Sequence, residues 1–251
     1  MKDVVVAIPT YNEKDNVEMI VSRTLAVDSE ISILVVDDNS PDGTGELADA
    51  LAARHERVHV LHRAGKEGLG PAYRAAIQWA RDHGFRYFAQ MDADGSHHPE
   101  ALPDLYAANH AGADLAIGSR WIPGGKTENW PFYRRWLSRG ASIYASVMLR
   151  ARIHDITAGF RIYRLRALQD WDLDTITSAG YCYQIEMSWR SRVCGLKITE
   201  VPITFTDRTE GVSKMSGGII GEAFFQVFSW GINARRGKLP FPVTQPVPEP
   251  E

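Results

Sequence analysis

Apolar and polar positions alternate along the first 120 residues in a regular order of strand, loop and helix. Strands buried on both faces are predicted for the short runs rich in Val, Ile and Leu, at residues 4–8, 31–36, 58–61, 85–91 and 113–118. Helices are predicted between these runs, at residues 15–26, 45–54, 72–83 and 99–111. This alternation indicates an α/β fold with a mostly parallel central sheet flanked by helices.

The pattern becomes less regular after residue 120. Residues 121–135 are rich in Gly, Pro, Trp and basic residues and predict a long loop. Further helices are predicted at residues 137–149, 181–193 and 219–233. Further strands are predicted at residues 162–168 and 197–205, the latter at a sheet edge because it contains Pro202. We expect a single domain over residues 1–238 and a proline-rich, disordered tail over residues 239–251.

Composition excludes several classes of protein. The net charge of −3 gives no global basic field, so nucleic acid is not an expected partner. Cys182 and Cys194 match no zinc or disulfide pattern and fit a reducing compartment. The N-terminus runs directly into strand-like sequence, and no window approaches the roughly 18 apolar residues of a membrane span. We expect a cytoplasmic protein that can lie on a membrane but does not cross it.

Two carboxylates follow the apolar run at residues 85–91. In an extended segment, residues i and i+2 point the same way, so Asp92 and Asp94 can converge on one ligand. Two anionic oxygens suit Mg²⁺ or Mn²⁺, which would complete its coordination with water and phosphate. Taken alone, the Asp-Ala-Asp-Gly segment is equally consistent with a polar turn.

A second polar cluster follows the first two strands. Pro9, Tyr11 and Glu13 leave one strand end, and Asp37 and Asp38 leave the next. A capping and turn cluster is the simpler explanation for acids here. The alternative, which we favour, is a nucleoside stacked beside Tyr11 and hydrogen-bonded to Asp38.

The absence of other phosphate motifs narrows the chemistry. No P-loop lysine motif and no Gly-x-Gly-x-x-Gly turn follows the first strand, so ATPase and dinucleotide-binding functions lose their main support. A diphosphate must then be held by the metal, which suits a nucleotide sugar whose diphosphate is the leaving group.

Basic residues accumulate in the second half of the chain, at Arg120, Arg134, Arg135, Arg139, Arg161, Arg208 and Lys214. Solvated surface charge explains any one of them. Arg120 differs because it closes an apolar strand, and Arg208 and Lys214 lie in a glycine-containing loop that can close over phosphates. His97 and His98 are expected to pack at the start of a helix rather than to bind metal.

Seven segments, in this order, resemble a family 2 glycosyltransferase of the GT-A fold, and within it the polyprenol-phosphate (dolichol-phosphate) mannose synthases. The resemblance covers about residues 4–238. It rests on IPTYNE at 8–13, VVDDNSPDGT at 35–44, MDADGSHHP at 91–99, GSR at 118–120, SRGA at 138–141, TAGFR at 157–161, and EVPI at 200–203 leading to DR at 207–208 and GVSK at 211–214.

The resemblance implies roles for individual residues. The nucleoside of GDP-mannose would be held by Pro9, Tyr11, Glu13, Val36 and Asp38. The diphosphate and the metal would meet Asp92, Ala93 and Asp94, with Asp94 the surest metal ligand. The phosphates of donor and acceptor would be held by Arg120, Arg208 and Lys214. Some relatives have a glutamine metal ligand where this chain has Ser96, so a water can replace it.

The resemblance also implies an activity, the transfer of mannose from GDP-mannose to a polyprenyl phosphate with inversion at the anomeric carbon. Such an acceptor is already anionic at neutral pH and needs no general base. The enzyme would lie peripherally on the cytoplasmic face of a membrane, where a membrane-embedded partner protein could assist it.

Other functions stay open at this point. The same scaffold could use UDP-glucose, UDP-GlcNAc or another donor, or could bind a nucleotide sugar without catalysis. A sugar-phosphate nucleotidyltransferase is disfavoured because no glycine-rich loop follows the first strand. Glu186 is left without a role.

The helix predicted at residues 219–233 carries an apolar stripe that includes Phe224, Val227 and Phe228. The stripe either packs against the sheet or lies in a membrane interface.

Overall fold

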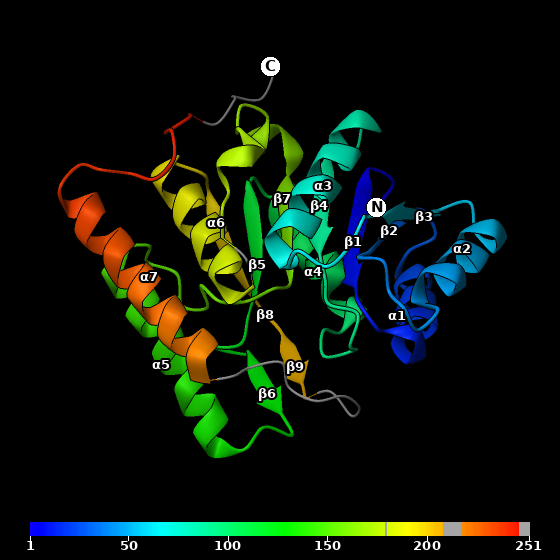
Figure 1. Cartoon of the computed structure of the whole chain (residues 1–251), viewed down its shortest axis with the longest axis horizontal. Coiled ribbons are helices and arrows are strands. Elements are labelled where there is room, and N and C mark those ends of the chain that lie inside the picture. The colour runs from blue at the N-terminus through cyan, green and yellow to red at the C-terminus, as the bar shows by residue number, and fades with distance from the viewer. Residues whose placement is uncertain (179, 208–216, 246–251) are drawn as a thin grey trace.

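A computed structural model describes residues 1–178, 180–207 and 217–245 (Figure 1). Its centre is a seven-stranded sheet with the strand order β3-β2-β1-β4-β7-β5-β8. The strands of this sheet are β1 (Val4–Thr10), β2 (Ser32–Asp37), β3 (Val58–His62), β4 (Tyr87–Gln90), β5 (Leu115–Ser119), β7 (Arg161–Arg164) and β8 (Ile198–Pro202). β7 runs antiparallel to both of its neighbours, and the other pairs are parallel. The mostly parallel sheet predicted from the sequence is confirmed.

Helices cover both faces of this sheet (Figure 1). They are α1 (Lys14–Val27), α2 (Thr44–Arg54), α3 (Leu69–Asp82), α4 (Leu102–His110), α5 (Phe132–Met148), α6 (Tyr181–Val193) and α7 (Gly217–Arg235). Short 3-10 turns are η1 (Pro99–Ala101), η2 (Leu165–Leu168) and η3 (Leu173–Thr175). A separate two-stranded parallel sheet joins β6 (Lys126–Glu128) to β9 (Thr204–Thr206).

Strand β1 shows how the sheet separates two apolar cores. Val5 and Ala7 pack on the side of α3 and α6, whereas Val4, Val6 and Ile8 pack on the side of α1, α2 and α4. All five side chains are fully buried, as expected for a strand covered on both faces. The sheet is therefore rigidly held, and its strand ends can position polar side chains accurately.

The segment predicted as a loop over residues 121–135 contains regular structure. Strand β6 lies inside it, and helix α5 begins at Phe132, five residues before the predicted start at 137. Pro131 directly precedes the helix, a place where proline is tolerated because the first amides of a helix have no intrahelical acceptor. Arg134 and Arg135 are consequently helical residues.

The predicted strand at residues 197–205 is divided in two. Pro202 ends β8, which is the edge strand of the large sheet as predicted, because proline has no amide to donate to a ladder. The chain then pairs with β6 through β9. This switch carries the chain from the large sheet to Asp207, after which residues 208–216 lie outside the described residues.

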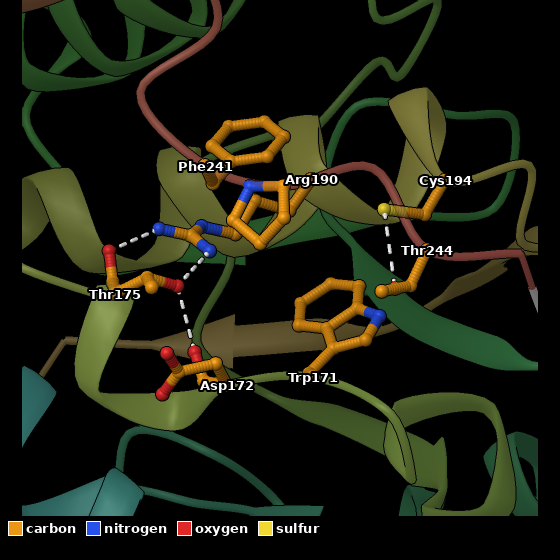
Figure 2. A pocket seen from close by; sticks show the side chains of 8 residues that line it. Trp171, Asp172, Thr175, Arg190, Cys194, Phe241 and Thr244 are labelled. Atoms are coloured by element: carbon orange, nitrogen blue, oxygen red, sulfur yellow. Dashed lines mark hydrogen bonds between the residues drawn. The ribbon is translucent and has the colours of Figure 1, made fainter.

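The first residues of the predicted tail pack against the domain through Phe241. Phe241 is 6% exposed, and its ring meets Trp189 of α6 edge-on with 5.0 Å between centroids. The Arg190 guanidinium lies 4.3 Å from the centroid of the same ring (Figure 2). The contacts of Phe241 with α6 thus offset the loss of conformational entropy on ordering the chain around Phe241. Residues 246–251 lie outside the described residues.

Candidate functional site

The carboxyl ends of β1 and β2 form one wall of the candidate site. Pro9 and Val36 are register partners, and the Asp38 amide donates to the Thr10 carbonyl at 3.1 Å. The Lys66 ammonium lies 4.3 Å from the centroid of the Tyr11 ring. The structure therefore brings four predicted nucleoside residues together, with the Val36 side chain fully buried below the others.

Asp37 shapes the turn after β2 and is itself internal. Its carboxylate accepts hydrogen bonds from the Ser40 hydroxyl at 2.6 Å and the Ser40 amide at 3.2 Å. The Thr10 hydroxyl donates to it at 3.3 Å. These bonds commit the Asp37 carboxylate to fixing the turn.

Asp38 is paired with an arginine that the sequence reasoning missed. Arg63 Nη1 donates to Asp38 Oδ1 at 2.6 Å, and Arg63 Nη2 donates to Glu67 at 2.5 Å. Burial raises the pKa of Asp38 above its usual value, although the Arg63 guanidinium opposes this rise. Arg63 could have been predicted as a site residue, because it directly follows β3 and so lies at the same sheet edge as Asp38.

Asp92 and Asp94 follow the end of β4, as predicted, with Ala93 buried between them. Asp94 Oδ1 accepts from the Ser96 hydroxyl at 2.5 Å and from the Ser96 amide at 3.1 Å. Ser96, which stands where some relatives have glutamine, thus orients the Asp94 carboxylate. The Asp92 amide donates to His97 Nδ1 at 3.1 Å, which fixes the backbone of the pair.

His97 supports this loop from below. Its ring stacks on Phe160 with 5.1 Å between centroids and meets Phe205 edge-on at 5.3 Å. Burial lowers the pKa of His97, and the nearby carboxylates of Asp92 and Asp94 only partly oppose this. His97 Nδ1 accepts the Asp92 amide while the ring packs against Phe160 and Phe205, so the structure shows the packing expected for His97.

The donor set at Asp92 and Asp94 fits a divalent metal held jointly by protein and substrate. Within the described residues, no group of three or more His, Cys, Asp or Glu side chains could hold a metal ion alone. Two carboxylates at one strand end match the one or two that Mg²⁺ takes from proteins when it also binds substrate phosphates. Asp92 and Asp94 are the residues that would hold Mg²⁺ or Mn²⁺.

Arg120 forms a buried ion pair at the end of β5. Its Nε donates to Asp155 Oδ2 and its Nη2 to Asp155 Oδ1, both at 2.7 Å. Burial acts to raise the pKa of Asp155, but the charge and hydrogen bonds of Arg120 outweigh it and hold that pKa below its usual value. Asp155 was not singled out from the sequence, since its partner lies 35 residues away.

Arg161 and Glu186 are structural in this fold. The Arg161 guanidinium is fully buried and donates to the carbonyls of Ala158, Ile156 and Gln184. Glu186, left unassigned from the sequence, pairs with Arg190 one turn later on α6. Both residues therefore hold the segments beside the site, and Arg161 is not one of the phosphate ligands.

Strand β9 lies beside the Asp94 loop. The Thr206 amide donates to the Ser96 carbonyl at 3.2 Å, which places this strand beside the Asp94 loop. Asp207 then accepts from Arg134 of α5 at 2.6 Å, and the Arg134 guanidinium lies 4.4 Å from the centroid of the Trp130 ring. Arg208 and Lys214, predicted as phosphate ligands, lie outside the described residues.

The fold and this carboxylate-lined sheet edge define a glycosyltransferase of GT-A architecture. The model of the family described as Glycosyl transferase family 2 matches residues 5–172. The chain belongs to this family. It is 54% identical over 231 residues to the polyprenol monophosphomannose synthase of Mycolicibacterium smegmatis, covering 92% of this chain and 87% of the relative.

Two further comparisons support the family and the fold. The undecaprenyl-phosphate mannosyltransferase of Micrococcus luteus is 50% identical over 232 residues, covering 92% of this chain and 95% of the relative. A solved glucosyl-3-phosphoglycerate synthase from Mycobacterium tuberculosis, in complex with Mn²⁺, UDP and glucosyl-3-phosphoglycerate, has a TM-score of 0.64. It is 16% identical and the match covers 94% of this chain and 81% of that one, so it bears on the fold alone.

Proposed function

We propose that this protein transfers mannose from GDP-mannose to the phosphate of a polyprenyl phosphate, with inversion at the anomeric carbon. The observation that carries the proposal is the pair Asp92 and Asp94 at the end of β4, next to the wall formed by β1 and β2. Two relatives that are at least half identical over nine-tenths of the chain are named for mannose transfer to polyprenyl phosphates.

The donor nucleoside fits the wall at β1 and β2. Tyr11 offers a ring face, and the Asp38 carboxylate can accept from a base N–H or a ribose hydroxyl. Arg63 holds one Asp38 oxygen, which restrains the rotation of this carboxylate before the ligand arrives. Glu13, at the N-terminal end of α1, completes this group of proposed contacts.

The diphosphate fits the Asp92–Asp94 loop. When bound, Mg²⁺ or Mn²⁺ would supply charge that neutralises the diphosphate as it departs. Asp94 is oriented for this role by Ser96, and Asp92 by the backbone bond to His97. Arg208 and Lys214, which lie outside the described residues, are proposed to bind the assembled phosphates, as the sequence resemblance implies.

The acceptor chemistry needs little acid–base assistance. A polyprenyl phosphate is anionic at neutral pH, so its oxygen can attack without first losing a proton to the enzyme. The buried acids Asp38, Asp155 and Glu186 are each paired with an arginine, which suits structural or electrostatic roles. Catalysis then rests on positioning the two phosphates and on stabilising the leaving group.

A lipid acceptor also gives a role to the exposed surface of α5 and α7, which pack side by side at one end of the molecule (Figure 1). Large apolar side chains are exposed here at Phe132, Tyr133, Trp136, Leu137, Ile143, Val147, Phe224, Phe225 and Phe228. In the part of the chain that the structure describes, no helix has both the length and the apolar character needed to cross a bilayer. We propose that this α5–α7 surface lies in the membrane interface, so that the protein is peripheral, with or without a membrane-embedded partner protein.

A direct assay tests the proposed function. Purified protein is incubated with a short polyprenyl phosphate, Mg²⁺ or Mn²⁺, and a panel of radiolabelled GDP-mannose, UDP-glucose and UDP-GlcNAc. The expected result is a lipid-linked mannose product that forms only with GDP-mannose and only when a metal is present. A product formed from a UDP sugar would mean that the donor is that UDP sugar instead of GDP-mannose. Binding of a nucleotide sugar without any product would favour a non-catalytic module.

A further inference from the structure

The Arg120–Asp155 pair is a candidate device for orienting a phosphate-binding group. Asp155 binds one edge of the guanidinium, through Nε and Nη2, and also accepts the Arg120 amide at 2.9 Å. Asp155 is fully buried and the Arg120 side chain is 9% exposed. Within the described residues, Nη1 of Arg120 makes no hydrogen bond, so a single guanidinium nitrogen is left for a ligand.

Asp155 is itself held from several elements. Its amide donates to Glu200 Oε1 on β8 at 2.9 Å. Its Oδ1 accepts from the Thr157 hydroxyl at 3.2 Å and from the Ser142 hydroxyl on α5 at 3.4 Å. The position of the carboxylate is therefore fixed jointly by β8, by α5 and by the turn that follows Asp155.

The pair also lies next to the proposed metal site. The Arg120 guanidinium is 5.3 Å from the centroid of the Phe205 ring, and Phe205 meets His97 edge-on at 5.3 Å between centroids. His97 Nδ1 is 3.8 Å from Asp92 Oδ2. The centroids of the Trp121 and Trp130 rings lie 5.3 and 5.5 Å from the Arg120 guanidinium carbon. Aromatic rings thus confine Arg120 where Asp155 directs it.

We propose that Asp155 is a positioning residue of the transfer reaction. By binding the Nε–Nη2 edge, it directs Nη1 of Arg120 towards a phosphate oxygen of donor or acceptor. The inference rests on the proposed function and on the sequence resemblance, which assigns Arg120 to the phosphates of donor and acceptor. Because the pair carries no net charge, Arg120 acts through the fixed direction of its N–H group rather than through free positive charge.

This inference predicts an effect of Asp155→Asn that differs from the effect expected if Asp155 only balanced the charge of Arg120. If Asp155 only offset a buried charge, Asp155→Asn would release that charge and tighten phosphate binding. A positioning role predicts instead that kcat falls on the order of 10- to 100-fold, because misplacement of a reacting group is that costly. The KM values for both substrates should change much less. An unchanged kcat, or a fall in either KM, would overturn the inference.

A double-mutant cycle with Arg120→Gln separates positioning from a general loss of structure. If Asp155 acts through Arg120, adding Asp155→Asn to Arg120→Gln should change kcat by less than about twofold, the usual limit of additivity error. Independent, multiplied losses would contradict the proposal. Glu186→Gln is the matched control, since it also removes a buried carboxylate from an arginine pair. It should lower Tm while leaving kcat within about twofold of the wild type.

Milder variants keep the test possible if Asp155→Asn does not fold, since breaking a buried ion pair is costly. Ser142→Ala removes a hydroxyl that donates to Asp155, and Thr157→Val removes a hydroxyl that donates to Asp155 and also accepts from Arg120 Nη2 at 3.1 Å, so Ser142→Ala is the more specific of the two. Both should lower kcat in the wild-type background and have no effect on kcat in the Arg120→Gln background. An effect that persists without Arg120 would contradict the inference.

An NMR readout separates failure of this inference from failure of the proposed function. The Nε–Hε resonance of Arg120, assigned with Arg120→Gln, should shift in Thr157→Val and Ser142→Ala whether or not any mannose is transferred. If the wild type transfers no sugar but this resonance responds, the proposed function fails and the orienting contact stands. If mannose is transferred and neither the resonance nor kcat responds, the inference fails alone.

Discussion

At the scale of single residues, Asp94 is the side chain on which metal binding depends most. Asp94→Asn keeps the volume and removes the charge, so the fold should be retained. We expect more than about a 100-fold loss of kcat, beyond the usual cost of losing an outer-shell partner of a metal ligand. Isothermal titration of GDP-mannose with and without Mn²⁺ checks the cause, because the metal-dependent part of the affinity should disappear.

Ser96→Ala provides a graded control for this variant. It removes the hydroxyl that donates to Asp94 Oδ1 but leaves both carboxylates in place. A loss of metal affinity of about 10-fold, clearly smaller than that of Asp94→Asn, is the expected result for an orienting partner. Metal-dependent affinity that survives in Asp94→Asn would remove Asp94 from the metal site.

Arg208 and Lys214 are predicted to act mainly in the transition state. Arg208→Ala and Lys214→Ala should therefore lower kcat far more than they weaken GDP binding, because closure is expected only over assembled phosphates. Steady-state kinetics and GDP titration on the same preparations measure the two effects. If GDP affinity fell as steeply as kcat, the two residues would instead belong to ground-state recognition.

The site residues that could be predicted are those marked by a pattern among residues close in sequence. Asp92 and Asp94 stand two apart at the end of an apolar run, and Asp38 directly follows another, so the sequence alone places them at one sheet edge. Asp155 carries no comparable signal. Its function comes from Arg120, Ser142 and Glu200, and only the folded chain brings these together.

At the scale of elements, the turn between β2 and α2 is packed too tightly to accept a larger residue. A Cβ at Gly45 would lie 2.9 Å from Asp37 Oδ2, the carboxylate that organises the turn below Asp38. Gly45→Ala should cost about 1–3 kcal/mol of stability through overpacking, and it should weaken nucleotide binding. Urea denaturation and GDP titration measure the two consequences.

Gly140 offers the opposite outcome with the same substitution. It lies inside α5, and no atom lies within 4 Å of a Cβ built there. Gly140→Ala should stabilise the protein by about 0.5–1 kcal/mol, the usual preference for alanine in a helix. If both glycine variants destabilised the protein equally, crowding at Asp37 would not be the reason.

Element boundaries after residue 120 could be predicted less well than those before it. The first half follows one rule, with apolar strands and amphipathic helices alternating, and its elements agree with the structure. Residues 121–135 show no period because β6 is short and the start of α5 exposes Phe132, Tyr133 and Trp136. A helix with exposed aromatic residues is not amphipathic in the usual sense, so its first turn looked like a loop.

At the scale of the whole molecule, the exposed α5–α7 surface should determine membrane binding. The predicted stripe on α7 divides, because Val227 is buried in the core while Phe224 and Phe228 are exposed. The packing interpretation of this helix therefore holds for the buried part, and contact of the exposed part with a membrane stays a prediction. Exposed basic residues near the α5–α7 surface should each contribute about 1 kcal/mol to the free energy of binding to an anionic membrane. Membrane binding should therefore be sensitive to salt.

Flotation on anionic liposomes at low and high salt measures this binding. Wild-type protein should float at low salt and less so at high salt, while Trp136→Glu/Phe225→Glu should remain in solution. The matched control is Met19→Glu/Val243→Glu, which adds the same charge at exposed apolar positions on other elements. Circular dichroism verifies that each variant is folded. A wild type that never floats would mean that a partner protein does all of the recruiting.

The packing of Phe241 against α6 determines where the protein can be shortened. A fragment ending at residue 238, the domain boundary expected from the sequence, would uncover Trp189. It would also remove the Phe241 ring that lies beside Arg190 (Figure 2). Arg190 also binds Thr175 and Glu186, and Glu186 in turn accepts the Ser178 amide. We therefore expect shortened versions of the protein to be more stable when they retain Phe241.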